Sequence, residues 1–315
     1  MTTPKSEKLL VISEIGIGDG LTMLPALKLL KQIHPNIQIE MLAPGLFFLA
    51  KNISTLVKLL DQNDVGGPQT SERLQWLQNQ GYRWVWNTEN ERSQWRPVLK
   101  QANNPQWICS PPHRSWPKQQ VLLLRLIQLK YLFPDLQGDL RMDLSLTPEQ
   151  MAQKNSFRKD YPKSHFLIAI QPGAKDSTKK WPKEKFRALS SLLAERGDLH
   201  ILFFLGPPDL PDYPENFLPN KENIEVINEP LDQLLPKLAA CDVFLGNDSG
   251  FYHLAYALGL KVIGIYRSRR NLKIWSYQSE RSRAIYFYLP SQIRRHWHKF
   301  ISVDRILNAI NGFVD

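Results

Sequence analysis

The stretch from Lys8 to Leu42, KLLVISEIGIGDGLTMLPALKLLKQIHPNIQIEML, decides the fold class. Its first five residues, 8–12, form a short apolar run typical of a buried strand, and a glycine-bearing turn follows. The apolar residues after the turn recur at helical spacing, at Leu24, Leu27 and Leu30, until Pro35 ends the pattern. Residues 37–42 predict a second strand. The chain therefore opens with a βαβ unit, which is typical of α/β proteins.

A second α/β series begins after a weaker stretch between Met142 and Lys163. Short apolar runs typical of strands lie at 165–171, 199–205, 224–227, 243–246 and 261–266. Helical patterns lie between them, at 183–196, at 231–240 and after Gly250. The alternation predicts two Rossmann-like parallel-sheet domains, over residues 1–155 and 156–300, with a ligand cleft between them. Residues 301–315 predict a final helix with Ser302 as its cap, and packing on the N-terminal domain is one arrangement for it.

The stretch 68–117 gives no regular pattern over most of its length. Residues 82–86, YRWVW, predict a strand, but Gln, Asn and Trp follow one another irregularly around it. The sequence therefore leaves the rest of this stretch unassigned.

Composition excludes several classes of protein. With 315 residues, 43% hydrophobic and 22% charged, the chain is neither disordered, collagen-like nor a coiled coil as a whole. No apolar run approaches the roughly 18 residues of a membrane span, so we expect no signal peptide, no transmembrane helix and a cytoplasmic protein. Cys109 and Cys241 lie far apart without C-x-x-C spacing, so we expect neither a disulfide framework nor a zinc site.

The net charge of +10 is concentrated in one segment. Between Lys261 and Lys299 the only acid is Glu280, and the basic residues are Lys261, Arg267, Arg269, Arg270, Lys273, Arg281, Arg283, Arg294, Arg295 and Lys299. Aromatic residues are interleaved with them. The segment is either a solvated basic face or a surface for phosphates on a nucleotide or a lipid headgroup. No nucleic-acid-binding motif accompanies it, so nucleic acid is not expected as a partner.

The turn EIGIGDG, residues 14–20, contains the first candidate for chemistry, Asp19. An aspartate after the first strand can cap the helix or act as a general base, and the spacing alone does not separate the two. A dinucleotide fingerprint would require glycine where Leu21 stands, and no P-loop lysine follows.

Three further strand ends lead into turns suited to a ligand. After Gln171, Lys179 and Lys180 precede a helix, which suits a phosphate, although an exposed basic loop is the alternative. After the strand at 243–246, Asp248 and Gly250 begin a helix that also contains His253. Asp248 can accept hydrogen bonds from sugar hydroxyls or cap the helix, and His253 is either catalytic or a structural histidine. The turn at Gly206 adds a weaker candidate.

Together these residues resemble glycosyltransferase family 9, the heptosyltransferase family of lipopolysaccharide core assembly. Three segments carry the resemblance: IGIGDGLTMLPALKLLKQIHP, QPGAKDSTKKWPKEKFRAL and LAACDVFLGNDSGFYHLAYALGLKVIGIY. They resemble that family's GDxxxxxPAL, PGAxxxxKxWPxExF and DSGxxHLAxALGxPxVxLF motifs, in the same order. The resemblance covers both domains and implies a GT-B fold and inverting, metal-independent transfer with no cofactor beyond the nucleotide-sugar.

The resemblance also implies a role for each matching residue. Asp19 matches the general base that deprotonates the acceptor hydroxyl, and Lys179 matches a lysine that contacts the donor. The residues that match the family's donor-binding motif are Asp248, Ser249, Gly250 and His253, with Gly206 at the nucleotide turn. ADP-heptose is the best donor prediction, and the expected acceptor is a cell-envelope glycan or lipid-linked molecule at the inner membrane surface.

Three departures from the family pattern affect the donor prediction. Ala174 and Lys175 replace a hydroxylated pair, the GGP turn reads Leu205-Gly206-Pro207, and RSRRN at 267–271 replaces GPT. Lys175, Arg267, Arg269 and Arg270 then become candidates for phosphate or membrane contacts. Two alternatives remain open: a nucleotide-sugar epimerase of related fold, and a nucleotide-sugar-binding protein without turnover.

Overall fold

The computed structural model describes residues 7–14, 16–89, 93–103, 105–110, 119–290 and 292–314. The chain divides into two compact units, Met1–Met142 and Asp143–Asp315. Helix α7 (Pro148–Lys159) begins behind a capping box made by Thr147 and Gln150 and packs on a helix of the C-terminal unit. A boundary at residue 155, as the sequence suggested, would therefore cut this helix.

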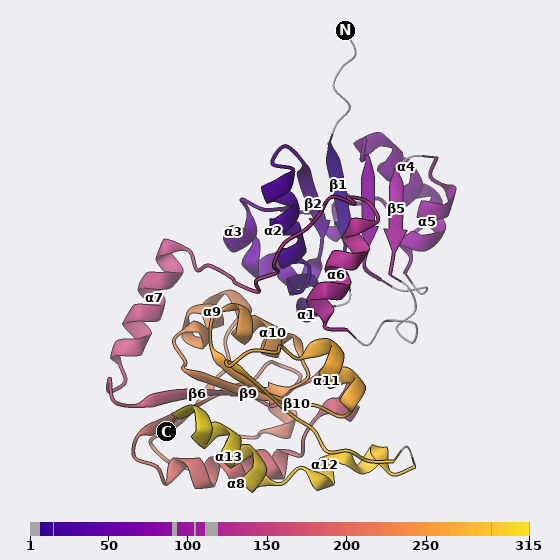
Figure 1. The fold of residues 1–315 in the computed structure, drawn as a ribbon. Helices are drawn as coiled ribbons and strands as arrows, with labels where there is room; N and C mark the ends of the chain where they lie inside the picture. Colours follow the sequence, from indigo (N-terminus) through magenta and orange to yellow (C-terminus); the bar gives the residue numbers. More distant parts are fainter. Residues whose placement is uncertain are drawn as a thin grey trace. The chain divides into compact units, whose positions relative to one another are not determined.

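The N-terminal unit is a five-stranded parallel sheet in the order β3-β2-β1-β4-β5 (Figure 1). Its strands are β1 (Lys8–Ile12), β2 (Gln38–Leu42), β3 (Lys58–Leu59), β4 (Trp84–Asn87) and β5 (Gln106–Cys109). Its helices are α1 (Ile17–Leu21), α2 (Leu24–Ile33), α3 (Ala50–Ile53), α4 (Thr70–Gln80), α5 (Trp95–Gln101) and α6 (Val121–Lys130). Two 3₁₀ turns, η1 (Pro44–Leu49) and η2 (Gln62–Asp64), join them.

Helices cover the N-terminal sheet in two pairs, α2 with α6 and α4 with α5. The α4–α5 pair encloses a core that includes Leu10, Val85 and Trp95. The stretch 68–117 thus contains α4, α5 and β5, which the sequence did not predict. Helix α4 is mostly polar, and only Leu77 is buried in it, so its apolar periodicity is too weak to read. Residues 90–92, 104 and 111–118 lie outside the described ranges.

The C-terminal unit is a six-stranded parallel sheet in the order β11-β10-β9-β6-β7-β8. Its strands are β6 (Phe166–Gln171), β7 (Leu199–Phe204), β8 (Ile224–Ile227), β9 (Val243–Asn247), β10 (Lys261–Ile265) and β11 (Ser282–Ile285). Its further helices are α8 (Lys183–Ala194), α9 (Leu231–Ala239), α10 (Gly250–Ala257), α11 (Arg269–Trp275), α12 (Trp297–Phe300) and α13 (Val303–Val314). The 3₁₀ turns are η4 (Ser177–Lys179), η5 (Leu210–Asp212) and η6 (Arg294–His296).

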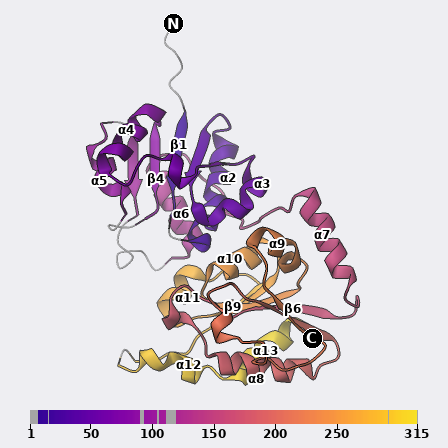
Figure 2. The same cartoon turned by 180° about the vertical axis from the view of Figure 1, so that it is seen from behind.

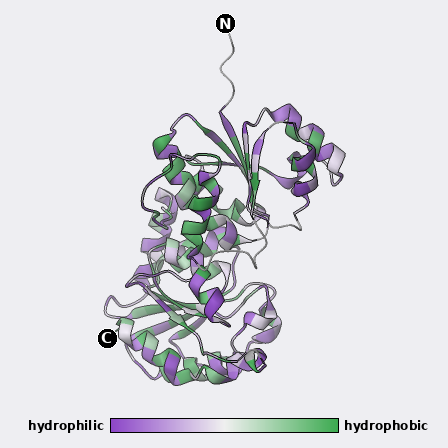
Figure 3. Ribbon diagram, turned by 45° about the vertical axis from the view of Figure 1, so that its right-hand side comes forward, coloured by the Kyte–Doolittle hydropathy of each residue, from purple (hydrophilic) through white to green (hydrophobic). Residues whose placement is uncertain are grey.

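Both faces of the C-terminal sheet are covered, α9 and α10 lying on one and α8 and α13 on the other (Figure 2). The central strands are mostly apolar and nearly all their residues are buried, as in parallel sheets covered on both sides. Helices α8 and α13 alternate between hydrophilic and hydrophobic residues (Figure 3), and Ile306, Ile310 and Phe313 of α13 join the domain core. Ser302 caps α13, as predicted. The C-terminal helix therefore belongs to this domain.

Strand order places the ligand-binding edge of each sheet. Counted within its own domain, the C-terminal sheet has the order 3-2-1-4-5-6, and the N-terminal sheet has the order 3-2-1-4-5. In such sheets the connections after strands 1 and 4 leave toward opposite faces. Ligands bind at the carboxyl ends of these two strands, a place called the topological switch point. The corresponding strands are β1 and β4 in one domain, and β6 and β9 in the other.

The structure bears on two further expectations from the sequence, one about disulfides and one about membrane-spanning helices. Cys109 and Cys241 are both free thiols. Among the helices that the structure describes, none combines the length and the apolar composition needed to cross a membrane.

Candidate active site

Asp19 lies in α1, directly after β1, and points its carboxylate at a buried cation. Asp19 Oδ1 is 3.2 Å from Nη2 of Arg125 on α6. Gly16 occupies the N-cap position of α1, and no side chain caps that helix. The Asp19 side chain therefore does not cap α1. Its carboxylate forms an ion pair with Arg125 instead.

Arg125 was missed by the sequence analysis. Its side chain is 1% exposed, whereas that of Asp19 is 24% exposed. Arg125 Nη1 also donates to Gln128 Oε1 (3.4 Å), and Gln128 in turn bonds Ser110 Oγ (3.0 Å) and Trp86 Nε1 (3.3 Å). Burial lowers the pKa of Arg125, and the Asp19 carboxylate opposes that shift. The one signal in the sequence is a cation in the middle of the largely apolar run VLLLRLIQLK.

Glu89, which follows β4, adds a second carboxylate to this edge of the sheet. Its Oε1 accepts a hydrogen bond from the backbone N of Glu14 (2.7 Å). Burial raises the pKa of Glu89, and the charges of Glu14 and Asp19 raise it further, against the hydrogen bonds that it accepts. The switch point between β1 and β4 is thus acidic, and the buried guanidinium of Arg125 contacts one of its carboxylates.

The second group of predicted residues meets at the switch point between β6 and β9. Lys179 Nζ, in η4, lies 2.8 Å from Asp248 Oδ2, and Asn271 Nδ2, on α11, donates to the same oxygen at 3.1 Å. Asp248 is 5% exposed, so its charge is nearly removed from solvent and is compensated by these two donors. The structure brings Lys179 and Asp248 together across 69 residues of sequence.

The surrounding backbone is held by Asn247, the last residue of β9. Its Oδ1 accepts from Trp181 N (2.9 Å), and its Nδ2 donates to Pro172 O (2.6 Å), so one amide fixes both ends of the loop after β6. Ser249 Oγ lies 3.3 Å from the Gln171 amide. Gly250 begins α10, and no side chain caps that helix, so its first amides point toward the same edge of the sheet.

His253, one turn into α10, has the environment of a structural histidine. It is 3% exposed, and its Nδ1 lies 2.7 Å from the hydroxyl of Tyr277. The rings of Tyr252, Trp275 and Tyr277 pack around it. Its ring therefore helps to fix α10 against the segment after α11.

Gly206 follows β7 and begins a turn, in which Asp209 N donates a hydrogen bond to Gly206 O (2.8 Å). A Cβ at this position would meet nothing closer than Pro208 Cδ at 3.6 Å. Protein packing therefore does not require glycine here. Lys180 Nζ contacts Asp209 and Asp212, at 3.3 and 3.4 Å, and links this turn to the loop after β6.

The residues of the basic segment fall into two groups, one bonded to helix ends and one exposed to solvent. Lys261 and Arg283 donate to the last carbonyls of α13, and Arg281 donates to Tyr256 O and Leu260 O at the end of α10. These three cations stabilise helix C-termini. The exposed members include Arg269 and Arg270 at the start of α11, while Lys175 is exposed before η4. The side chain of Arg294 lies outside the described part of the chain.

The family model of glycosyltransferase family 9 (heptosyltransferase) matches residues 103–293, more than half of the chain. This chain belongs to glycosyltransferase family 9. Lipopolysaccharide heptosyltransferase 1 of Campylobacter coli is 30% identical over 131 residues, 39% of this chain and 38% of that protein. The matched segment therefore spans well under half of that relative.

Solved structures extend the likeness to both domains. A family 9 glycosyltransferase from Veillonella parvula superposes with a TM-score of 0.79 over 99% of this chain and 98% of that one, at 16% identity. ADP-heptose heptosyltransferase II of E. coli gives 0.73 over 98% of each chain, at 17% identity. E. coli heptosyltransferase WaaC, solved with ADP, gives 0.67 over 97% and 99%, at 17% identity. The fold is therefore that of the GT-B heptosyltransferases.

Proposed function

We propose that the chain is an inverting glycosyltransferase that transfers heptose from ADP-heptose to a cell-envelope glycan or lipid-linked acceptor. The observation that carries the proposal is the Lys179–Asp248 pair at the switch point of the C-terminal sheet, with Asn271 on the same carboxylate. E. coli WaaC, of the same fold, has been solved with ADP and with an ADP-fluoroheptose.

The donor would bind along the carboxyl edge of β6, β9 and β10. Lys179 supplies a cation and the N-terminus of α10 supplies backbone amides, and both favour a diphosphate. Asp248 can accept hydrogen bonds from the hydroxyls of the donor sugar. Charge that develops on the leaving ADP would be stabilised by these fixed groups without a metal ion.

Asp19 would be the general base. It would remove the proton from the acceptor hydroxyl while that oxygen attacks the anomeric carbon from the face opposite the departing ADP, which inverts the configuration. Arg125 holds the Asp19 carboxylate from below, and the part-exposed side of Asp19 stays open to an acceptor. We further propose that transfer takes place at the cytoplasmic face of the inner membrane.

A transfer assay tests the proposal directly. The protein is incubated with ADP-heptose and a lipid-linked acceptor fraction in EDTA, and ADP release and the product's anomeric configuration are measured. We expect acceptor-dependent ADP release and inversion. The Asp19→Ala variant should lose transfer and still bind ADP. ADP-heptose turnover without an acceptor-derived product would instead favour epimerase-like chemistry, and ADP binding without turnover would favour a non-catalytic protein.

A further inference from the structure

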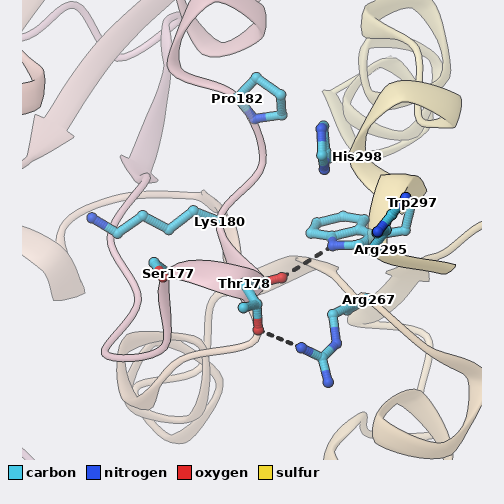
Figure 4. Close-up of a pocket in the computed structure, with 8 residues that line it drawn as sticks. All are labelled: Ser177, Thr178, Lys180, Pro182, Arg267, Arg295, Trp297 and His298. Atoms are coloured by element: carbon cyan, nitrogen blue, oxygen red, sulfur yellow. Dashed lines mark hydrogen bonds between the residues drawn. The ribbon is translucent and has the colours of Figure 1, made fainter.

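A cavity of about 540 Å³ lies in the C-terminal domain beside the residues assigned to the donor (Figure 4). Three segments form it: the loop before α8, the turn after β10, and the η6–α12 region. Its lining residues are Ser177, Thr178, Lys180, Pro182, Arg267, Arg295, Trp297 and His298. Lys179 and Asp248 do not line it, so the cavity is adjacent to the proposed donor site and distinct from it.

Hydrogen bonds within the protein fix the three segments that form the walls of the pocket. Trp297 Nε1 donates to the carbonyl of Thr178 at 3.0 Å, and Arg267 Nη1 donates to the hydroxyl of the same residue. The Trp297 side chain is almost completely buried. Lys185 Nζ also donates to His298 O (2.9 Å) and Ile301 O (2.7 Å), which ties α12 to α8. The three segments therefore form a preorganised pocket.

Carboxylates neutralise the positive charge of the pocket only in part. Hydrogen bonds from Thr178, and the nearby charges of Arg267 and Lys179, lower the pKa of Asp176. The ammonium of Lys180 contacts two carboxylates, but within the described ranges neither Arg267 nor Arg295 forms an ion pair with a carboxylate. Burial lowers the pKa of His298, and the neighbouring side chains of Lys299, His296 and Lys185 lower it further. The smaller contributions of Lys299 and Lys185 to this shift agree with a local field that attracts anions.

The donor groups match a phosphate. Guanidinium groups bind phosphate oxygens through paired N–H donors, and the hydroxyl of Ser177 adds another donor to the lining. In Figure 4, Arg267 and Thr178 lie at one end of the pocket, and Pro182 and His298 lie at the other. The cavity volume falls within the roughly 300–1,000 Å³ of small-molecule sites, so it exceeds what a phosphate alone would fill.

We propose that this pocket binds a phosphomonoester carried by a sugar-sized group, at a second anion site beside the donor site. The phosphoryl group contacts Arg267 and Arg295, and the group that carries it lies toward Pro182 and His298. The same chemistry is presented by a soluble sugar phosphate and by a phosphorylated lipid headgroup, so the experiment includes both.

The test titrates the full-length protein with glucose 6-phosphate and with glucose by calorimetry, and follows the His298 imidazole by NMR. We expect binding of glucose 6-phosphate and not of glucose, and a rise in the pKa of His298 on binding. Arg295→Gln should weaken the affinity at least about tenfold, since it removes a charge-assisted contact. Arg305→Gln, which removes an exposed arginine of α13, is the matched control and should change nothing. ADP affinity should be unchanged in both variants.

A parallel arm measures sedimentation with phosphatidic acid and phosphatidylcholine vesicles. Selective binding to phosphatidic acid that Arg295→Gln weakens, without binding of glucose 6-phosphate, would assign the phosphate to a lipid. The proposal is overturned if neither probe binds, or if Arg295→Gln has no more effect than Arg305→Gln. It is also overturned if Arg295→Gln weakens ADP binding equally, because the pocket would then be part of the donor site. Failure of the wild type to bind ADP would refute the proposed function instead.

Discussion

A buried guanidinium is costly unless an anion replaces the water that it loses. Arg125 meets that requirement through Asp19, so the residue proposed as the base also compensates a charge inside the N-terminal domain. Gln128, Ser110 and Trp86 continue the network away from the site. Asp19 is therefore held by a rigid partner rather than by a mobile surface side chain.

This coupling predicts a result for a double-mutant cycle. Asp19→Asn leaves the Arg125 charge without its carboxylate, and Arg125→Met leaves Asp19 without its cation, so each single change should lower the free energy of unfolding. The two losses should overlap by on the order of 1–2 kcal/mol in the double variant. Urea unfolding of the four proteins measures this. Fully additive losses would show that the pair contributes nothing to stability.

Glu89 predicts a pH dependence. Its pKa is raised in the folded protein by burial and by Glu14 and Asp19, so folding favours the protonated carboxyl. The stability that Glu89 contributes is therefore complete below its unfolded pKa and is lost as the pH rises through its folded pKa. Glu89→Gln should be more stable than the wild type at pH 8 and should lose this advantage at pH 4. Equal differences in melting temperature at the two pH values would contradict the assignment.

At the scale of elements, the strand pattern was readable because both sheets bury apolar runs on two faces. β1 and β8 were predicted with their observed bounds, and most other predicted strands differ by one or two residues. Helix α4 was missed because its exposed surface is polar throughout. The elements α11 and β11 were missed because they are short and contain few apolar residues among the basic ones.

The site was predictable to the extent that it lies at strand ends. The turns that contain Asp19, Lys179 and Asp248 follow β1, β6 and β9, and parallel strands present their carboxyl ends at one edge. Arg125 and Asn271 were not predictable in this way, since each reaches the site from a helix distant in sequence. Sequence spacing carries no information about such long-range side-chain contacts.

Replacing either of two glycines near strand ends with alanine should change the melting temperature by different amounts. A Cβ at Gly246, inside β9, would lie 2.8 Å from Gln171 O and 2.7 Å from Phe244 Cζ, so Gly246→Ala should lower the melting temperature by several degrees. Gly206 has room for a Cβ, so Gly206→Ala should leave the melting temperature unchanged and weaken ADP binding if the nucleotide approaches this turn. An unchanged ADP affinity would remove Gly206 from the donor site.

At the scale of the whole molecule, two Rossmann-like domains have separate cores, and the proposed chemistry is divided between them. The proposed base and its buried cation belong to the N-terminal domain, and the proposed donor residues belong to the C-terminal domain. Donor binding and proton removal should therefore be separable by mutation, with Lys179 variants losing the nucleotide and Asp19 variants retaining it.

The most direct test of the central claim is a thermal-shift panel of the wild type and Lys179→Ala with ADP, UDP, GDP and CMP, in magnesium and in EDTA. A ligand at 100 times its dissociation constant adds about 2.7 kcal/mol, which corresponds to several degrees for a domain of this size. We predict a shift with ADP alone that is equal in magnesium and in EDTA and is lost in Lys179→Ala. The assignment of the donor site would be contradicted if none of the nucleotides shifted the melting temperature, or if Lys179→Ala retained the ADP shift.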